Sequence, residues 1–312
     1  MKLVIFSTLA GLLITLFQPE IFSQLGSFLK VIFNPFSVRF PANWDPADTP
    51  NLLTAIAYAG MGGFLNLMYS YWLKDTGVGM AKYFGRITSP ITGKSEIIPE
   101  SGYRFEDTAE NRKNWRGWFR YLRLDNFFAL SLNTLTLCLT TFLGLVILHP
   151  KGEYPSGWKI AVVQAQFFEV SLGHLGKILF LIAAALFLVD TWLGLADGVS
   201  RMFADFTFAN FKKAREKSFR FWYYLWLGWL IFVTGLTMLV AQPATLINIA
   251  GVISLFAFVL FIPLLWRLNY CLIPRSFPDF ARPKKLTVIG LLISWSFYLA
   301  IAVLFLKISF FK

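Results

Sequence analysis

The feature that most constrains this chain is a series of seven long apolar runs. Apart from a shorter first run, each is about 20 residues long, which is the length of helix that crosses the hydrocarbon core of a bilayer. Lipid offers no hydrogen-bond partner to the backbone, so spans of this kind must be helical. The sequence therefore predicts an all-α, polytopic helical membrane protein with about seven transmembrane helices. The predicted spans are Leu3–Phe17, Leu52–Leu73, Phe127–Leu148, Ile178–Gly198, Phe221–Val240, Leu246–Trp266 and Leu286–Leu306.

The first run has two interpretations. Lys2 before a short apolar core also resembles a secretory signal. No small-residue cleavage site follows in "TLFQPEIFSQ", so we expect a retained span. The whole chain, residues 1–312, is then one membrane domain. It has an outer segment at 18–50 that holds a short interfacial helix, and a cytoplasmic loop of mixed charge at 74–126.

Basic residues predict the orientation of the chain, because cytoplasmic loops collect Lys and Arg. Lys2 and the segments 74–126, 201–220 and 267–285 together hold 22 of the 29 basic residues. All four lie on one side if the seven spans alternate in direction. We therefore expect a cytoplasmic N-terminus and an external C-terminus.

This asymmetry also accounts for the net charge of +12 without a nucleic-acid partner. The stretch "ENRKNWRGWFRYLR" could be a basic and aromatic platform for RNA. It is better explained as a juxtamembrane helix whose arginines meet anionic lipid while Trp115 and Trp118 lie at the headgroups. The expected partner is the lipid bilayer.

Signs of enzymatic chemistry are scarce. The chain has two histidines, His149 and His174, at the outer ends of different spans, and its two cysteines, Cys138 and Cys271, are too far apart in the predicted topology to pair. No nucleophile elbow, Walker loop, HExxH or CxxC motif is present. We therefore predict that the protein is not an enzyme and carries no cofactor, and the balance shifts toward a protein that moves something.

Polar residues inside apolar spans are the first candidates for a transport path. Asp190 in "FLVDTWLGLADG" follows a dozen apolar residues, where a carboxylate is costly unless it meets a cation, a proton or a donor. A hydrogen-bonded aspartate that packs helices together is an equally good explanation. Asp197, near the inner end of the same span, is interpreted as an interface residue.

The second predicted span has a weak centre. "AGMGG" places Gly60, Gly62 and Gly63 in four positions, and Asn66 follows one turn later. Consecutive small residues lower the cost of leaving the helix, and transporters use the carbonyls freed in a broken span to hold ions. Close packing of helices is the alternative explanation for the glycines.

The run "YAGMGGFLNLMYSYWLKDTGVGMAKYFGRITSPITG" resembles the sixth helix and following loop of the Nramp family of divalent metal transporters, in a divergent bacterial branch. Asn66-Leu67 falls on the Asn-Leu of that family's Met-Pro-His-Asn-Leu motif. "AAALFLVDTWLGLADGVSRMFADF" is similar to the family's eighth helix, and "ISLFAFVLFIPLLWRLNYCLIPR" to its tenth. The resemblance covers the chain from about Leu52 onward. It implies a partial LeuT-like fold, a bacterial inner (plasma) membrane, and secondary transport of a divalent cation.

By this resemblance the ion path and binding site consist of Ala59, Gly60, Gly63, Asn66 and Asp190, with Gly60 and Asn66 as metal ligands. The sequence departs from the family where Gly63 replaces its metal-binding Met and Leu65 its His; Met61 is out of register. Without sulfur, carbonyl and carboxylate oxygens suit harder cations such as magnesium or manganese.

The family's first helices, with their Asp-Pro-Gly-Asn motif, have no counterpart in these seven spans. Asp45-Pro46 in "NWDPADTPN" lies in a polar outer loop and is not a substitute. We therefore expect a fragment or the second half of a split transporter, whose partner is an N-terminal half carrying the missing helices. The alternative is a non-transporting membrane subunit or scaffold that keeps the fold but has lost the ion site.

Overall fold

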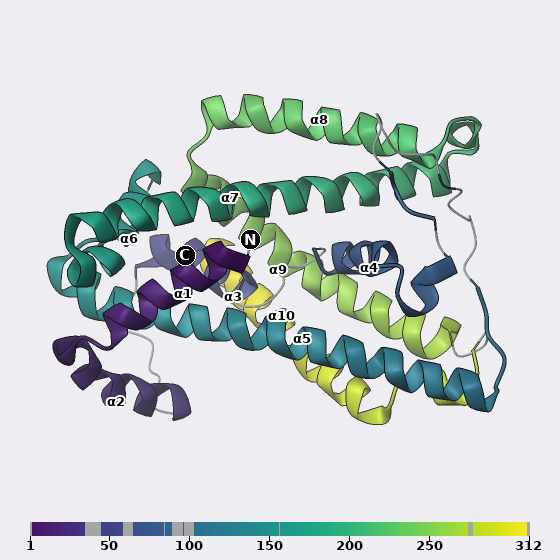
Figure 1. The fold of residues 1–312 in the computed structure, drawn as a ribbon, viewed down its shortest axis with the longest axis horizontal. Coiled ribbons are helices and arrows are strands. Elements are labelled where there is room, and N and C mark those ends of the chain that lie inside the picture. Colours follow the sequence, from purple (N-terminus) through teal and green to yellow (C-terminus); the bar gives the residue numbers. More distant parts are fainter. Residues whose placement is uncertain are drawn as a thin grey trace. The chain divides into compact units, whose positions relative to one another are not determined.

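The computed structural model describes residues 2–34, 45–58, 65–83, 85–88, 96, 103–155, 157–273 and 277–310. Within these ranges every regular element is a helix, which confirms the all-α class (Figure 1). The LeuT-like arrangement remains a prediction.

Five helical stretches among the described residues are long and apolar enough to cross a membrane. Each contains one of the predicted spans, from the third to the seventh. They are Ala109–Lys151, Gln166–Asn210, Phe219–Val240, Pro243–Leu272 and Asp279–Ile308. The first stretch comprises α5 (Ala109–Leu143), a π-helix (Gly144–Leu148) and a 3-10 turn (His149–Lys151). The second and third are α7 (Gln166–Asn210) and α8 (Phe219–Val240). The fourth comprises α9 (Pro243–Arg267) and a π-helix (Leu268–Leu272), and the fifth includes a 3-10 turn (Asp279–Ala281) and α10 (Lys285–Phe310).

The first predicted span, Leu3–Phe17, coincides with a helix within one residue at each end. α1 (Lys2–Leu16) is followed by α2 (Pro19–Phe33), and the two helices meet at 94°. The pair counts as one broken span or re-entrant loop by length and composition. α2 lies in the segment 18–50, where a short interfacial helix is predicted. Pro19 suits its first turn, where a backbone N–H has no intrahelical partner.

The second predicted span is described as two helices. α3 (Thr49–Tyr58) and α4 (Leu65–Asp75) are each too short to cross a bilayer. The predicted break, which includes Ala59, Gly60 and Gly63, falls within 59–64 and lies outside the described residues. The prediction of an unwound centre therefore remains a prediction.

The chain divides into two compact units. The first comprises residues 1–48, 129–195 and 237–248, and the second comprises 49–128, 196–236 and 249–312. α5 and α7 contribute residues to both units. α6 (Ile160–Gln164) and the 3-10 turn Gly157–Lys159 belong to the first, and the 3-10 turns Gly79–Tyr83 and Lys212–Glu216 to the second.

The first unit has an apolar core in which α1 packs closely against the start of α7. Leu12, Phe142 and Phe168 are almost fully buried in it. Gly11 permits this packing, because a Cβ atom at that position would lie 2.2 Å from the Phe168 ring. Thr15 Oγ1, also fully buried, lies 2.5 Å from the Phe167 carbonyl oxygen. A helix interface with a small residue and an internal hydroxyl is typical of membrane helices.

In the second unit, α3 packs against α9 and α10. Leu53, Leu255 and Ala302 form the buried centre of this contact. A Cβ atom at Gly251 of α9 would lie 2.8 Å from the Thr54 Cα atom, so the two backbones approach as closely as glycine allows. The close contact of α3 thus uses a glycine of the neighbouring helix.

α9 continues through Pro263, which has no N–H to donate to the carbonyl four residues earlier. That carbonyl belongs to Val259. The indole N–H of Trp295 in α10 donates to it at 3.0 Å. A neighbouring helix therefore satisfies the backbone acceptor that the proline frees, as a membrane span requires.

Of the three basic segments predicted to share one side of the membrane, 74–126 contacts both of the others in the second unit. The ring of Phe105 lies 5.2 Å from that of Phe277 and 5.8 Å from that of Phe280. Asp75 and Arg201 form an ion pair at 2.5 Å. These contacts join 74–126 to both 267–285 and 201–220, as segments on one side must be able to do.

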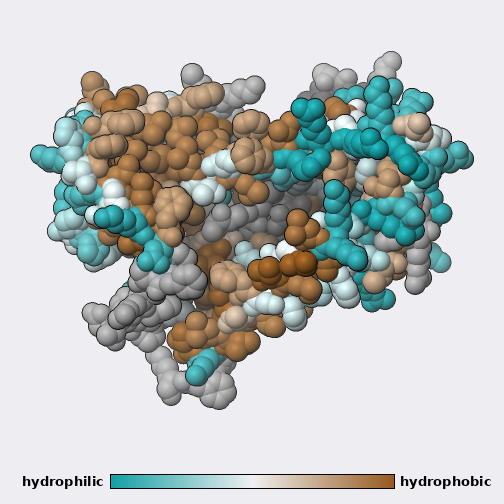
Figure 2. Space-filling model, turned by 90° about the horizontal axis from the view of Figure 1, so that it is seen from below, coloured by the Kyte–Doolittle hydropathy of each residue, from teal (hydrophilic) through white to brown (hydrophobic). Residues whose placement is uncertain are grey.

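Apolar side chains are widely exposed on the helices. Leu188 in α7 is 64% exposed, and Leu260 in α9 is 70% exposed. Figure 2 shows broad hydrophobic areas on one face, with hydrophilic atoms mostly toward its edges. Lipid covers such surfaces in a membrane protein, and water does not.

Candidate functional site

The richest cluster of polar contacts surrounds the end of α4. In the sequence "YSYWLKD", three aromatic side chains each donate a hydrogen bond to a different aspartate of a neighbouring helix. The distances are 2.6 Å from Tyr69 to Asp125, 2.6 Å from Tyr71 to Asp205 and 3.1 Å from Trp72 to Asp197. The acceptor in the first bond is on α5 and in the other two on α7.

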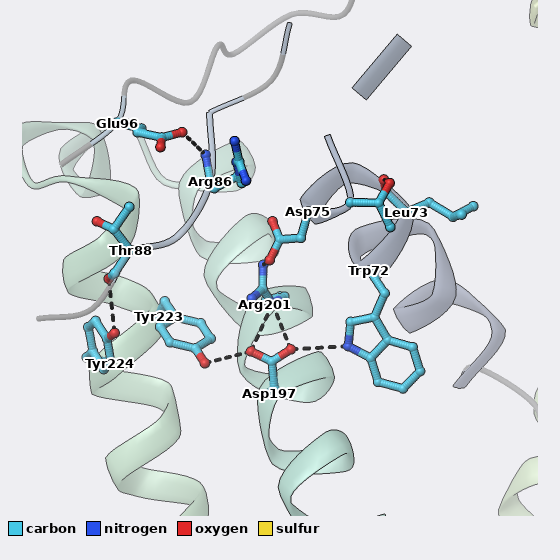
Figure 3. A network of polar contacts seen from close by, with 11 residues as sticks. Trp72, Leu73, Asp75, Arg86, Thr88, Glu96, Asp197, Arg201, Tyr223 and Tyr224 are labelled. Carbon is cyan, nitrogen blue, oxygen red and sulfur yellow. Dashed lines mark hydrogen bonds and ion pairs between the residues drawn. The ribbon is translucent and has the colours of Figure 1, made fainter. Parts of the chain in front are cut away.

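Arg201 of α7 is the centre of this cluster (Figure 3). Its side chain is only 10% exposed. Nη1 lies 2.5 Å from Asp75 Oδ2, and Nε donates to both carboxylate oxygens of Asp197 at 3.0 Å. The Tyr223 hydroxyl of α8 donates to Asp197 at 2.7 Å. One guanidinium and one carboxylate thus join α4, α7 and α8.

Local structure places these groups. Asp197 and Arg201 are four residues apart, so they lie on the same face of α7. The connection from Asn210 to Phe219 turns the chain back, so α8 runs beside α7 (Figure 1). The indole N–H of Trp226 then donates to Thr207 Oγ1 at 3.0 Å. Tyr223, one turn earlier on α8, reaches the guanidinium with its ring, 5.5 Å from the Arg201 Cζ atom.

The electrostatics of the cluster are governed by burial. Burial raises the pKa of the Asp75 carboxyl, which lies just beyond the predicted span, although the Arg201 guanidinium lowers it in turn. Desolvation therefore raises the pKa of Asp75 more than the Arg201 guanidinium lowers it. Such a pair adds little net stability, but removing one partner leaves a buried charge and costs much more.

The cluster does not offer a cation site. The oxygens of Asp75 and Asp197 accept bonds from Arg201, Trp72 and Tyr223. Within the described ranges, no group of three or more His, Cys, Asp or Glu residues could hold a metal ion. We call this set of residues, comprising Trp72, Asp75, Asp197, Arg201 and Tyr223, the Arg201 cluster; its arrangement fastens helix ends together.

The residues predicted for the ion path are only partly described. Asn66 lies in the first turn of α4, in the second compact unit. Asp190 lies in α7, in the first unit; it is half-buried and has no hydrogen bond or ion pair with any described residue. Asp197, predicted to lie at the interface near the inner end of its span, accepts bonds from Trp72 of α4, Arg201 of α7 and Tyr223 of α8.

The sequence analysis did not find the Arg201 cluster. Its members come from three helices, and Trp72 and Asp197 are 125 positions apart. The available signal was the concentration of donors in "YSYWLKD" together with aspartates at the ends of two other spans. Interfacial Tyr and Trp side chains are common enough that this signal is weak.

All regular elements of the described ranges are helices, and several of them are long and apolar, which defines a membrane-embedded helical protein. Comparison with protein families, with characterised proteins and with solved structures finds no match to the chain.

Proposed function

We propose that the chain is a subunit of an Nramp-like secondary transporter that carries a divalent cation across the membrane together with a partner. The observation that supports this most is in the sequence: Gly60, Gly62 and Gly63, followed by Asn66, interrupt the second apolar run. Broken spans supply ion sites in many transporters.

The chemistry of helix ends suits a cation at this place. The last four carbonyls of a helix have no intrahelical partner, and this end carries a partial negative charge. In the proposal, the helix that begins as α3 ends within residues 59–64 and presents its free carbonyls there. In the proposal, backbone carbonyls of Ala59 and Gly60 and the amide of Asn66 contribute oxygen ligands, and Asp190 adds charge to the path.

These oxygens are too few for a complete site. Magnesium demands about six oxygens in near-octahedral order. The proposed partner, an N-terminal half with four spans, supplies the remaining carboxylate and carbonyl groups. In this proposal the basic segments 74–126, 201–220 and 267–285 face the cytoplasm, the N-terminus is cytoplasmic and the C-terminus is external.

A non-transporting subunit is the second candidate. One observation favours it: the aspartates around α4 already accept bonds from Arg, Tyr and Trp side chains, so they hold helices together. A scaffold requires no more than such contacts between helices.

Uptake by proteoliposomes separates the two candidates. We expect no measurable manganese or magnesium flux from the chain alone, and flux when a four-span partner carrying the Asp-Pro-Gly-Asn helix is added. Asp190→Asn should then reduce the flux. Asp279→Asn is the matched control, because that side chain is 83% exposed and its ion pair is with the nearby Arg282.

The outcomes are distinct. Robust flux from the isolated chain would show that no partner is needed. No flux with the partner present, while the two chains still assemble, would favour the scaffold.

A further inference from the structure

A basic pocket lies near the paired ends of α7 and α8, within the second unit. Its volume is about 300 Å³. The described residues that line it include four cations, which are Arg86, Arg215, Lys217 and Arg220, against two anions, Glu96 and Glu216. This pocket is separate from the cation path proposed above, since a cation would be repelled here.

The walls of the pocket are held by specific contacts. Arg215 Nε donates to the Phe208 carbonyl at 3.2 Å, which satisfies an acceptor near the end of α7. The Tyr224 hydroxyl of α8 donates to the Thr88 carbonyl at 3.2 Å and so attaches the segment 85–88 to the helix (Figure 3). The cations thus project from a framework with fixed backbone positions.

The pocket already accommodates one anionic group. The backbone N–H of Arg86 donates to the Glu96 carboxylate at 2.7 Å. Backbone donors beside guanidinium and ammonium groups are the usual ligands of phosphate. The described lining carries four positive and two negative side chains, so its net charge attracts a further anion.

The position of the pocket indicates where that anion comes from. α7 ends at Asn210 and α8 begins at Phe219, and both helices are membrane spans by length and composition. Phospholipid headgroups lie at the ends of spans. Basic pockets between transmembrane helices on the cytoplasmic side are known to bind anionic headgroups.

We propose that this pocket binds the phosphate group of an anionic phospholipid headgroup. Lys217 and Arg220 provide the charge that attracts the phosphate, and Arg215 provides guanidinium donors as well as holding the end of α7. Free inorganic phosphate has the same chemistry and is the other source that the experiment must distinguish.

The test uses the purified full chain in a neutral detergent and follows its thermal stability during titration with short-chain phosphatidylglycerol. Saturable stabilisation is expected, and phosphatidylcholine should give much less. The double variant Lys217→Gln/Arg220→Gln should raise the half-saturating lipid concentration about 30-fold, given the usual contribution of two basic residues near a charged surface.

The matched control is Lys212→Gln/Lys213→Gln. It removes the same charge from the same connection, and neither residue lines the pocket. In this control variant the half-saturating lipid concentration should change less than about threefold. If both double variants weaken binding equally, or if phosphatidylcholine binds as well as phosphatidylglycerol, general surface attraction explains the result and the proposed site is wrong.

Two further measurements complete the test. Lys217→Gln alone should weaken binding about fivefold, which keeps the proposal testable if the double variant does not fold. Inorganic phosphate should compete with the lipid only at much higher concentration. If inorganic phosphate saturates the protein at a lower concentration than the lipid does, the pocket binds a phosphate group but its natural source is the free ion.

Discussion

Replacement of Arg201 by glutamine tests the Arg201 cluster directly. The substitution leaves the carboxylates of Asp75 and Asp197 without their cation. Removing one partner of a buried ion pair costs about 3–5 kcal/mol. The two aspartate side chains are 29% and 28% exposed, so water screens part of this cost and we expect about 2–3 kcal/mol.

In a chain of this size about 1 kcal/mol corresponds to about 2 °C in Tm, so the expected fall is about 4–6 °C. The assay is thermal unfolding of the purified protein in detergent, followed by fluorescence. Heating of membrane proteins is often irreversible, so all variants must be compared at one scan rate.

The chain contains a matched control. Arg112 pairs with Asp107 through two bonds, at 2.5 and 2.8 Å, but these side chains are 51% and 42% exposed. Exposed pairs contribute little to stability, so Arg112→Gln should lower Tm much less than Arg201→Gln does. Equal losses for Arg201→Gln and Arg112→Gln would refute the argument from burial.

A second control removes the cause of the penalty. In the background Asp75→Asn/Asp197→Asn no carboxylate is left unpaired, so Arg201→Gln should cost much less there than in the wild type. If the cost is the same in both backgrounds, Arg201 stabilises the protein by packing and not by pairing.

Two other substitutions give expected outcomes. Trp295→Phe removes the donor to the Val259 carbonyl and should lower the stability of the protein by about 0.6–1.7 kcal/mol. In the Pro263→Ala background a backbone N–H is restored, so the loss of Tm caused by Trp295→Phe should largely disappear. An equal loss in both backgrounds would contradict this account. Burial raises the pKa of Asp75, so the folded chain takes up this proton before the unfolded chain, and the penalty of the buried charge is relieved as pH falls through the folded-state pKa. The Tm of the wild type minus that of Asp75→Asn should therefore become more positive as pH falls from neutral toward the ordinary carboxyl pKa of 3.8. A difference that becomes more negative would show that pairing with Arg201 outweighs burial.

Hydropathy located five of the seven predicted spans but not the ends of their helices. The span predicted at Ile178–Gly198 lies inside α7, which has 45 residues. Hydropathy falls where polar residues begin, whereas a helix continues while its backbone hydrogen bonds continue. The helix also contains a bend at Gly173, where φ is 62°, a conformation that glycine adopts easily.

Single residues in a span were a poor guide to the polar contacts. Asp190 was conspicuous because its sequence neighbours are apolar, yet it has no partner among the residues that the structure describes. Asp197 was less conspicuous, yet it accepts bonds from Arg201, Trp72 and Tyr223. The sequence shows the cost of a carboxylate in lipid, but its partner depends on which helices pack together.

The two short helices of the second predicted span are attached to the rest of their unit by different kinds of interaction. α3 relies on close apolar contact, with Leu53 packed among α9 and α10 and Thr54 against Gly251. Contacts of this kind depend on fit, because lipid tails are as apolar as the helices. They have little directionality, and a small shift along the interface replaces one contact with a similar one.

α4, in contrast, is held by directional bonds at its end. Tyr69, Tyr71, Trp72 and Asp75 each bond to a different side chain on α5 or α7, and a shift of one ångström would break several of these bonds together. A rearrangement of this span therefore costs less at α3 than at α4. If this span rearranges during the proposed cation transport, α3 should shift along α9 and α10 while α4 stays fixed to α7 by the Arg201 cluster.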